Sequence, residues 1–186
     1  MNKRIYFLFF FLVGAVSFTS CVKEYEMEYT SAELLAGRWM VSGDPYLDHW
    51  VLLTTNSKND ASKIILTDNR GTATGGRKNQ GGALWNFAVT VSADPSALTF
   101  GQSTDITNEW YYTQIKDPVV IKYDIKVRVK NGKIERNAVT LPSGGKADKI
   151  SFILAFEDNA IPFEEWNMVG YRISGHTEDE EFIYKQ

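Results

Sequence analysis

The sequence predicts an all-β domain: an antiparallel up-and-down β-barrel of about eight strands, preceded by one short helix. Short apolar runs recur along the chain, separated by turns rich in glycine, proline and asparagine, and no long helical pattern or internal repeat interrupts them. In the clearest run, Ile125, Val127 and Val129 alternate with basic residues, as in a strand with one buried face. Successive strands of this kind close well into a barrel, because closure leaves no strand edge exposed.

The expected elements follow one another at short intervals. A helix is predicted over residues 30–36, because Thr30 and Glu33 form a capping box and Gly37 stops the helix. Asn131-Gly132 is the favoured two-residue hairpin sequence and predicts a tight turn. Strands are predicted over residues 38–41, 49–55, 63–67, 85–91, 97–100, 123–130, 138–141, 149–156, 167–175 and 181–184.

The barrel is expected to have a substantial core, since 13% of the residues are aromatic. Residues 69–82 hold five glycines among polar residues and predict a loop at the rim. The aromatic residues that fall on apolar strand faces are expected inside the barrel: Trp39, Trp85, Phe87, Phe152 and Phe156.

Residues 1–20 predict a lipoprotein signal peptide. Two basic residues, Lys3 and Arg4, precede the apolar run 5–18, which is shorter than the roughly 20 residues of a membrane-spanning helix. The run ends in Phe18-Thr19-Ser20-Cys21, which is similar to the cleavage box of signal peptidase II substrates. We therefore expect a diacylglyceryl group and an amide-linked acyl chain on Cys21, a permanent anchor. The alternative is an ordinary secretory signal with an incidental cysteine.

Residues 21–29 predict an acidic tether in front of the barrel domain, residues 30–186. Lys23 is followed by glutamates at alternate positions, a pattern that resembles the tether of Bacteroidetes lipoproteins displayed on the outer face of the outer membrane. The expected location is thus the outer membrane, lipid-anchored and exposed at the surface. A solvated linker without an export role is the alternative.

Charge and cysteine content exclude several classes of protein. The chain has 20 basic and 23 acidic residues; loss of Lys3 and Arg4 with the signal leaves 18 basic residues and a net charge of −5. A nucleic-acid partner would require a basic surface, so none is expected. Cys21 is the only cysteine, so acylation leaves no thiol for a disulfide or a nucleophile.

No catalytic, metal or cofactor signature is present. Gly101-Gln102-Ser103-Thr104-Asp105 lacks the final glycine of a nucleophile elbow. The two histidines, His49 and His176, stand singly beside acidic residues, without the spacing of a metal site. The acidic run 178–181 is interpreted as a charged strand edge. The sequence therefore predicts a protein without a metal or cofactor, and non-catalytic.

A short motif opens the barrel region. Gly37-Arg38-Trp39, directly after the predicted helix, is similar to the opening Gly-x-Trp motif of lipocalins and other calycins. The resemblance implies a lipocalin-like barrel in which Gly37 and Trp39 close one end. It further implies that an arginine from the last strands covers the tryptophan, and Arg172 is the candidate.

Residues 30–186 as a whole resemble Bacteroidetes lipocalin-like lipoproteins described as lipid-binding putative hydrolases. This family implies a lipid-like ligand, whereas the activity in its description has no motif in this sequence. The matching stretches are residues 36–41, 131–134, 146–152 and 169–179.

These observations predict a protein that binds a small apolar or amphipathic ligand in a cavity of the barrel. The first alternative is a surface glycan-binding or scaffold accessory protein with an exposed aromatic platform, and the second is an esterase-like hydrolase. The candidate ligand-binding residues are Trp50, Trp110, Tyr111, Tyr112 and Trp166.

Overall fold

The computed structural model describes residues 31–43, 49–57, 60–68, 86–113, 120–176 and 179. The predicted signal peptide, Cys21, the acidic tether, the glycine-rich loop, Trp85 and the strand 181–184 lie outside the described residues, so those predictions stay untested. The elements in chain order are η1 (Ser31–Leu35), β1 (Gly37–Gly43), β2 (His49–Ser57), β3 (Asp60–Thr67), β4 (Ala88–Asp94), β5 (Thr99–Phe100), β6 (Ile106–Thr107), β7 (Tyr111–Thr113), β8 (Val120–Lys122), β9 (Lys126–Thr140), β10 (Lys146–Phe156) and β11 (Trp166–Arg172).

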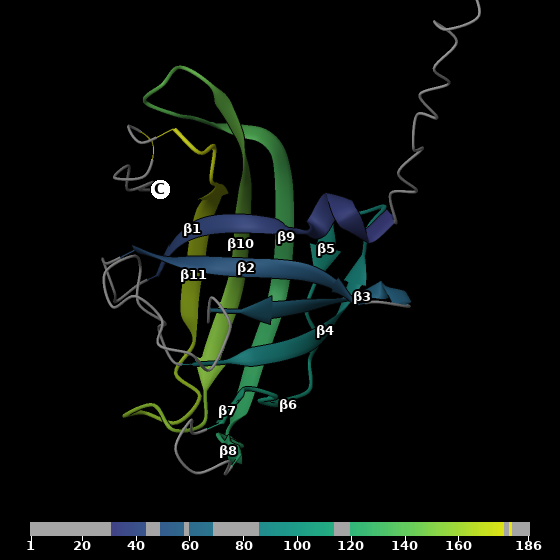
Figure 1. Cartoon of the computed structure of the whole chain (residues 1–186), viewed down its shortest axis with the longest axis vertical. Coiled ribbons are helices and arrows are strands. Elements are labelled where there is room, and N and C mark those ends of the chain that lie inside the picture. Colours follow the sequence, from purple (N-terminus) through teal and green to yellow (C-terminus); the bar gives the residue numbers. More distant parts are fainter. Residues whose placement is uncertain are drawn as a thin grey trace, which may run out of the picture.

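Eight of these strands close into an antiparallel barrel. The order around the barrel is β1-β2-β3-β4-β5-β9-β10-β11, and β11 pairs with β1 to complete the ring. Strands β1–β4 cross β9–β11 at a steep angle, and η1 lies at one end of β1 and β2 (Figure 1). The predicted all-β, lipocalin-like, up-and-down barrel is confirmed. The short helix is present as a 3₁₀-helix.

The predicted hairpin turn at Asn131-Gly132 is wrong. Strand β9 runs through these residues, and its pairing with β10 jumps from Lys133↔Ser151 to Lys130↔Ile153. Asn131 has φ 53°, so this is a β-bulge, in which the extra residue takes a left-handed conformation. The same local conformation serves a turn or a bulge, and here the long pairing partner β10 decides between them. The chain reverses later, between Thr140 and Lys146.

Gly132 allows the short strand β5 to close the barrel at this bulge. Phe100 of β5 pairs with Gly132. A Cβ atom at position 132 would lie 2.4 Å from the Phe100 ring, so only glycine lets the two strands approach.

Three short strands were not predicted. Strand β6 pairs with the start of β9, while β7 and β8 form a separate two-stranded sheet beside the barrel. Each has two or three residues, too few to show an alternating pattern.

The inward side chains pack into one apolar cluster. It includes Trp39, Phe87, Phe152 and Phe156, as predicted, together with Leu35 of η1. Burying each large side chain of this kind contributes about 1.5–3 kcal/mol, so the cluster holds the barrel together. A second cluster lies on the opposite face of the same strands: Met40, Val51, Val139, Leu141, Ala147 and Tyr171.

Candidate ligand-binding site

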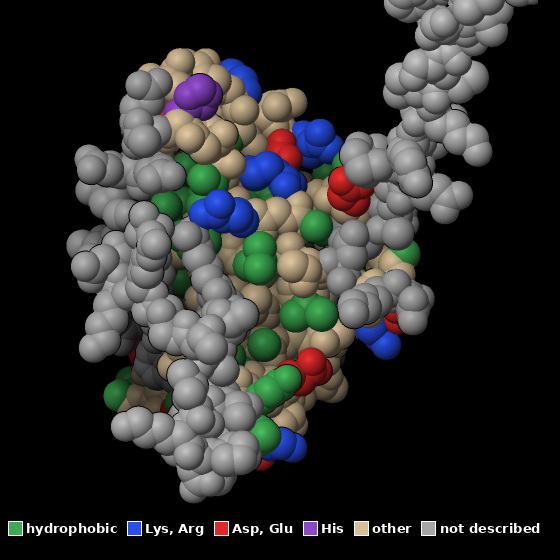
Figure 2. All heavy atoms as spheres, viewed as in Figure 1, with side chains coloured by type: hydrophobic (Ala, Val, Ile, Leu, Met, Phe, Trp, Pro, Cys, Tyr) green, Lys and Arg blue, Asp and Glu red, His purple; other side chains and the backbone are tan. Residues whose placement is uncertain are grey.

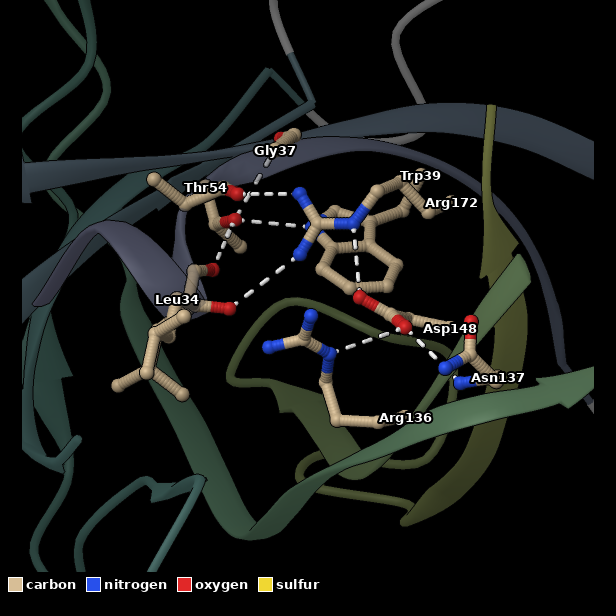
Figure 3. A network of polar contacts seen from close by, with 10 residues as sticks. Leu34, Gly37, Trp39, Thr54, Arg136, Asn137, Asp148 and Arg172 are labelled. Atoms are coloured by element: carbon tan, nitrogen blue, oxygen red, sulfur yellow. Dashed lines mark hydrogen bonds and ion pairs between the residues drawn. The ribbon is translucent and has the colours of Figure 1, made fainter. Parts of the chain in front are cut away.

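One end of the barrel is sealed by η1 and Trp39; we call it the helix end. Trp39 is fully buried, and its indole Nε1–H donates to Thr54 Oγ1 over 2.9 Å. The Thr54 hydroxyl in turn donates to the carbonyl of Leu35 in η1, over 2.6 Å (Figure 3). The indole N–H and the Thr54 hydroxyl each have an acceptor, so the indole is held in one orientation.

Arg172, in β11, lies over Trp39. Its guanidinium carbon is 4.4 Å from the centroid of the tryptophan ring, a cation–π distance. Nη1 and Nη2 donate to the carbonyls of Ala36 and Leu34, over 2.5 and 3.3 Å, and so bond the C-terminal end of η1. The structure thus brings together the three residues that the resemblance singled out.

Gly37 leaves the space that Arg172 occupies. A Cβ atom at position 37 would lie 2.3 Å from Arg172 Nη1. Atoms do not approach so closely, so a side chain at position 37 would displace the guanidinium. In this chain, the Gly-x-Trp motif therefore combines an indole with room for the cation above it.

Asp148 balances the charge at the helix end, and the sequence analysis missed it. Its carboxylate accepts from Arg172 Nε over 3.1 Å and from the backbone N–H of Asn137 over 3.0 Å, and it pairs with Arg136 at 3.3 Å (Figure 3). Asn137 has φ 53° and lies at a second irregularity of β9. One sign was present in the sequence. Asp148 directly follows Ala147 on a strand, and a carboxylate buried there needs a partner, because burying it alone is costly.

The opposite end of the interior, which we call the far end, is lined by aromatic rings: Trp50, Phe87, Phe156 and Trp166. It is far from η1 because Gly37 pairs with Thr54 at the helix end, whereas Trp50, the second residue of β2, pairs with Val41 toward the other end of β1. The Phe156 ring packs edge-on against Phe87 and Trp166, with centroids 5.5 and 5.8 Å apart. This geometry gives a rigid apolar wall.

Trp50 differs from Trp39 in its hydrogen bonding. The side chain is 5% exposed and belongs to the interior cluster. Its Nε1–H has no hydrogen-bond partner in the part of the chain that the structure describes. The indole N–H of Trp50 is therefore a buried donor among apolar rings.

The other predicted ligand-binding residues do not form one platform. Trp166 is 1% exposed and faces the interior, so it is wrong to place it on an exposed aromatic surface. The acidic residues before it suggested a surface segment, but β11 begins at Trp166 and turns it inward. Tyr111 is 61% exposed on the β7–β8 sheet, and Trp110 is half-buried. The side chain of Tyr112 lies outside the described residues.

Asn108 fixes the segment before β7 to the far end. Its side-chain nitrogen donates to the carbonyls of Asn86 and Tyr123, over 3.1 and 2.9 Å. Its side-chain oxygen accepts from the backbone of Ala88 over 2.8 Å. Buried in this way, Asn108 joins the starts of β4 and β7 to the chain before β9.

Asp179 forms a hydrogen-bonded carboxylate cluster on the outer side of the barrel. It accepts from the hydroxyl groups of Ser174 and Ser143 over 2.6 and 2.9 Å, and from the Ser143 N–H. Burial alone would raise the pKa of Asp179, but these bonds and the charge of His176 outweigh it and hold the pKa below its usual value. The cluster joins the β9–β10 loop to the chain after β11.

This cluster lacks the order of a hydrolytic triad. A nucleophilic serine gives its proton to a base of suitable pKa, normally an imidazole. Ser174 and Ser143 instead donate straight to a carboxylate whose lowered pKa makes it a weak base. His176 is exposed, and its backbone N–H donates to Ser174 Oγ. The arrangement serves to hold chain segments together. The side chain of His49 lies outside the described residues.

A groove of about 460 Å³ lies where β5 meets the bulge of β9, lined by Thr99–Ser103 and Lys130–Lys133. Its size suits a small ligand. Its two cations are already paired, however: Lys130 with Glu165 at 2.5 Å and Lys133 with Glu135 at 3.0 Å. The lining therefore favours no ligand class.

Charged side chains of both signs lie on the described surface. On the face shown in Figure 2, basic and acidic side chains of the described residues are interspersed. The described residues contain no group of three or more histidine, cysteine or acidic side chains arranged to hold a metal ion. None of the helices among them has the length and apolar character needed to cross a membrane.

The comparison with protein families found a match for most of the chain. No curated protein matched the chain. The model of the family described as "lipid-binding putative hydrolase" matches residues 24–177. This span includes every strand of the barrel and both of its ends. With most of its length matched in this way, the chain belongs to that family of lipid-binding proteins.

Proposed function

We propose that this protein holds a small apolar or amphipathic, lipid-like ligand in its barrel while a lipid anchor keeps it at the outer membrane. The observation that carries the proposal is the aromatic interior at the far end, in a chain of a lipid-binding family. Burial of apolar surface, at about 25 cal/mol per Å², would supply most of the binding energy.

The two ends of the barrel suggest the direction of entry. At the helix end, Arg172 and η1 cover Trp39 and use the available hydrogen bonds. Opening this end would break the polar network around Arg172 and Trp39, whereas at the far end the rings of Phe87, Phe156 and Trp166 meet through apolar contacts. A ligand would therefore enter at the far end, and Trp50 and Trp166 would line its path.

The anchor part of the proposal rests on the N-terminal sequence. Cleavage before Cys21 and acylation of its thiol and amino group would fix the protein permanently in a membrane. The acidic tether supports a place on the outer face of the outer membrane, and with the phenylalanine-rich signal it supports a Bacteroidetes source. Barrel and anchor together describe a lipid carrier that stays attached at its site of action.

Native mass spectrometry tests the binding part. The protein, purified in a mild detergent, is expected to carry non-covalent adducts of lipid mass that disappear after extraction with organic solvent. They should return when lipid is added back. A protein that neither arrives with lipid nor takes it up would contradict the proposal.

Peptide mass spectrometry tests the anchor. The N-terminal fragment should begin at Cys21 and carry the mass of three acyl chains. Cys21→Ser should leave the protein unacylated and released from membranes. An unmodified Cys21 in the mature protein would overturn the anchor while leaving lipid binding open.

A further inference from the structure

We propose that the ligand carries a neutral oxygen acceptor, such as an ester carbonyl, that takes the indole N–H of Trp50, so that the barrel selects acyl esters over plain hydrocarbons. This inference rests on the proposed function, because it names the chemical class of the ligand. It goes beyond the family's description in assigning one atom of this chain to the choice of ligand.

The position of Trp50 makes its donor available inside the barrel. Trp50, Leu52 and Thr54 alternate along β2 and belong to the face that points inward. Trp50 stands opposite Val41 of β1, whose side chain is fully buried. The indole therefore lies within the interior, 95% shielded from solvent.

A buried indole N–H can only donate, and buried donors in proteins are nearly always bonded. The same barrel shows the usual arrangement at Trp39, where Thr54 supplies the oxygen. At Trp50, no partner is found among the described residues. A phenylalanine would fill this apolar region without leaving a donor unsatisfied. We therefore infer that the ligand supplies the acceptor for the Trp50 N–H.

The surroundings of Trp50 favour a neutral acceptor over a charged one. The interior cluster consists of leucine, isoleucine, valine, methionine, phenylalanine and tryptophan, with no basic side chain among its described members. A carboxylate without a counter-charge is far more costly to bury than an ester carbonyl. A buried donor also discriminates strongly against a ligand without the matching acceptor, since binding would leave the donor unpaired.

The test compares three ligands with the same chain length: methyl laurate, laurate and dodecane. Their affinities for the delipidated full-length protein are measured by displacement of N-phenyl-1-naphthylamine. We expect the native protein to bind methyl laurate at least tenfold more tightly than dodecane, and more tightly than laurate at pH 8. Trp50→Phe should reduce the affinity for methyl laurate about tenfold and leave that for dodecane within twofold.

The indole resonances of the native protein give a second reading that needs no variant. Methyl laurate should move the Trp50 N–H proton downfield, whereas the Trp39 proton, already bonded to Thr54, should stay in place. Dodecane should leave the Trp50 proton near its unliganded position.

The outcomes distinguish a failure of this inference from a failure of the proposed lipid binding. Equal affinity for methyl laurate and dodecane, an unmoved Trp50 resonance, or a preference that survives Trp50→Phe would overturn this inference while lipid binding stands. Tighter binding of laurate would overturn the choice of a neutral acceptor. Failure of all three ligands and of the probe to bind would overturn the proposed function and this inference together.

Discussion

The two ends of this barrel bury tryptophans in opposite ways. At the helix end, Trp39 has a threonine for its indole nitrogen and an arginine over its ring. At the far end, Trp50 keeps an N–H with no partner among the described residues, in a region of apolar rings. Residues that stabilise a fold make full use of their hydrogen bonds, whereas a binding site keeps some for its ligand. On our proposal, the helix end therefore stabilises the fold and the far end binds the ligand.

The largest effect is expected from filling the space above Trp39. Gly37→Ala would place a Cβ atom 2.3 Å from Arg172 Nη1 and force the guanidinium off the ring. Overpacking of this kind costs about 1–3 kcal/mol, and the lost cation–π contact adds to it. Urea denaturation of the purified protein would measure the change in the free energy of unfolding.

Gly145→Ala is the matched control for this change. A Cβ atom there would meet only the flexible Ser143 hydroxyl, at 3.4 Å, so stability should change by less than about 0.5 kcal/mol. Equal effects of the two alanine variants would mean that Arg172 is not held tightly at the helix end.

The next effect concerns the charge that holds Arg172. Asp148→Ala removes a largely buried carboxylate and leaves the guanidinium and the Asn137 N–H without this partner. We expect a loss of about 1–3 kcal/mol in the free energy of unfolding, because a buried group is left unsatisfied. Thermal unfolding followed by circular dichroism would give the shift.

Arg136→Ala separates this loss from the effect of a surface ion pair. Arg136 meets the same carboxylate, but its side chain is more than half exposed, so its removal should cost well under about 1 kcal/mol. A larger loss for Arg136→Ala than for Asp148→Ala would mean that the exposed Arg136, rather than the bond between Asp148 and Arg172, stabilises this end of the barrel.

Features that depend on neighbouring residues could be predicted from the sequence, whereas features that depend on distant strands could not. Strand alternation depends on neighbouring residues, and it predicted the barrel and the burial of Phe87, Phe152 and Phe156. Asn131-Gly132 was misinterpreted because positive φ suits a turn or a bulge, and the choice depends on pairing with β10.

The residues at the two ends of the barrel divide by the same criterion. Gly37, Trp39 and Arg172 could be proposed because a family motif links them across the chain. Thr54 and Asp148 could not, since nothing close in sequence shows which polar group a distant strand will meet. The same reason hid the missing partner of Trp50, which only the packed barrel reveals.

A smaller effect is expected on the outer side, at Asp179. Its pKa lies below the usual value, so its hydrogen bonds stabilise the folded protein above the unfolded pKa of about 4. That stability should be lost as the pH falls through the lower, folded pKa. Asp179→Asn should therefore flatten the fall in stability below about pH 4, measured by urea denaturation across a pH series. An unchanged acid slope would mean that other carboxylates dominate.

The smallest effect gives the sharpest test of the two ends, because one substitution can be made at each. Trp39→Phe and Trp50→Phe remove the same indole nitrogen and reduce the side-chain volume by the same amount. At Trp39 the change also removes the bond to Thr54, worth about 1 kcal/mol. At Trp50 it removes a buried donor without a partner, which offsets part of the lost packing. Trp39→Phe should therefore be the more destabilising by about 1–2 kcal/mol in the ligand-free protein.

Methyl laurate should then narrow this difference, since it stabilises the native protein and Trp39→Phe more than Trp50→Phe. If the two variants were equally unstable without ligand, the far end would already supply its own acceptor, and the distinction between a structural end and a binding end would fail.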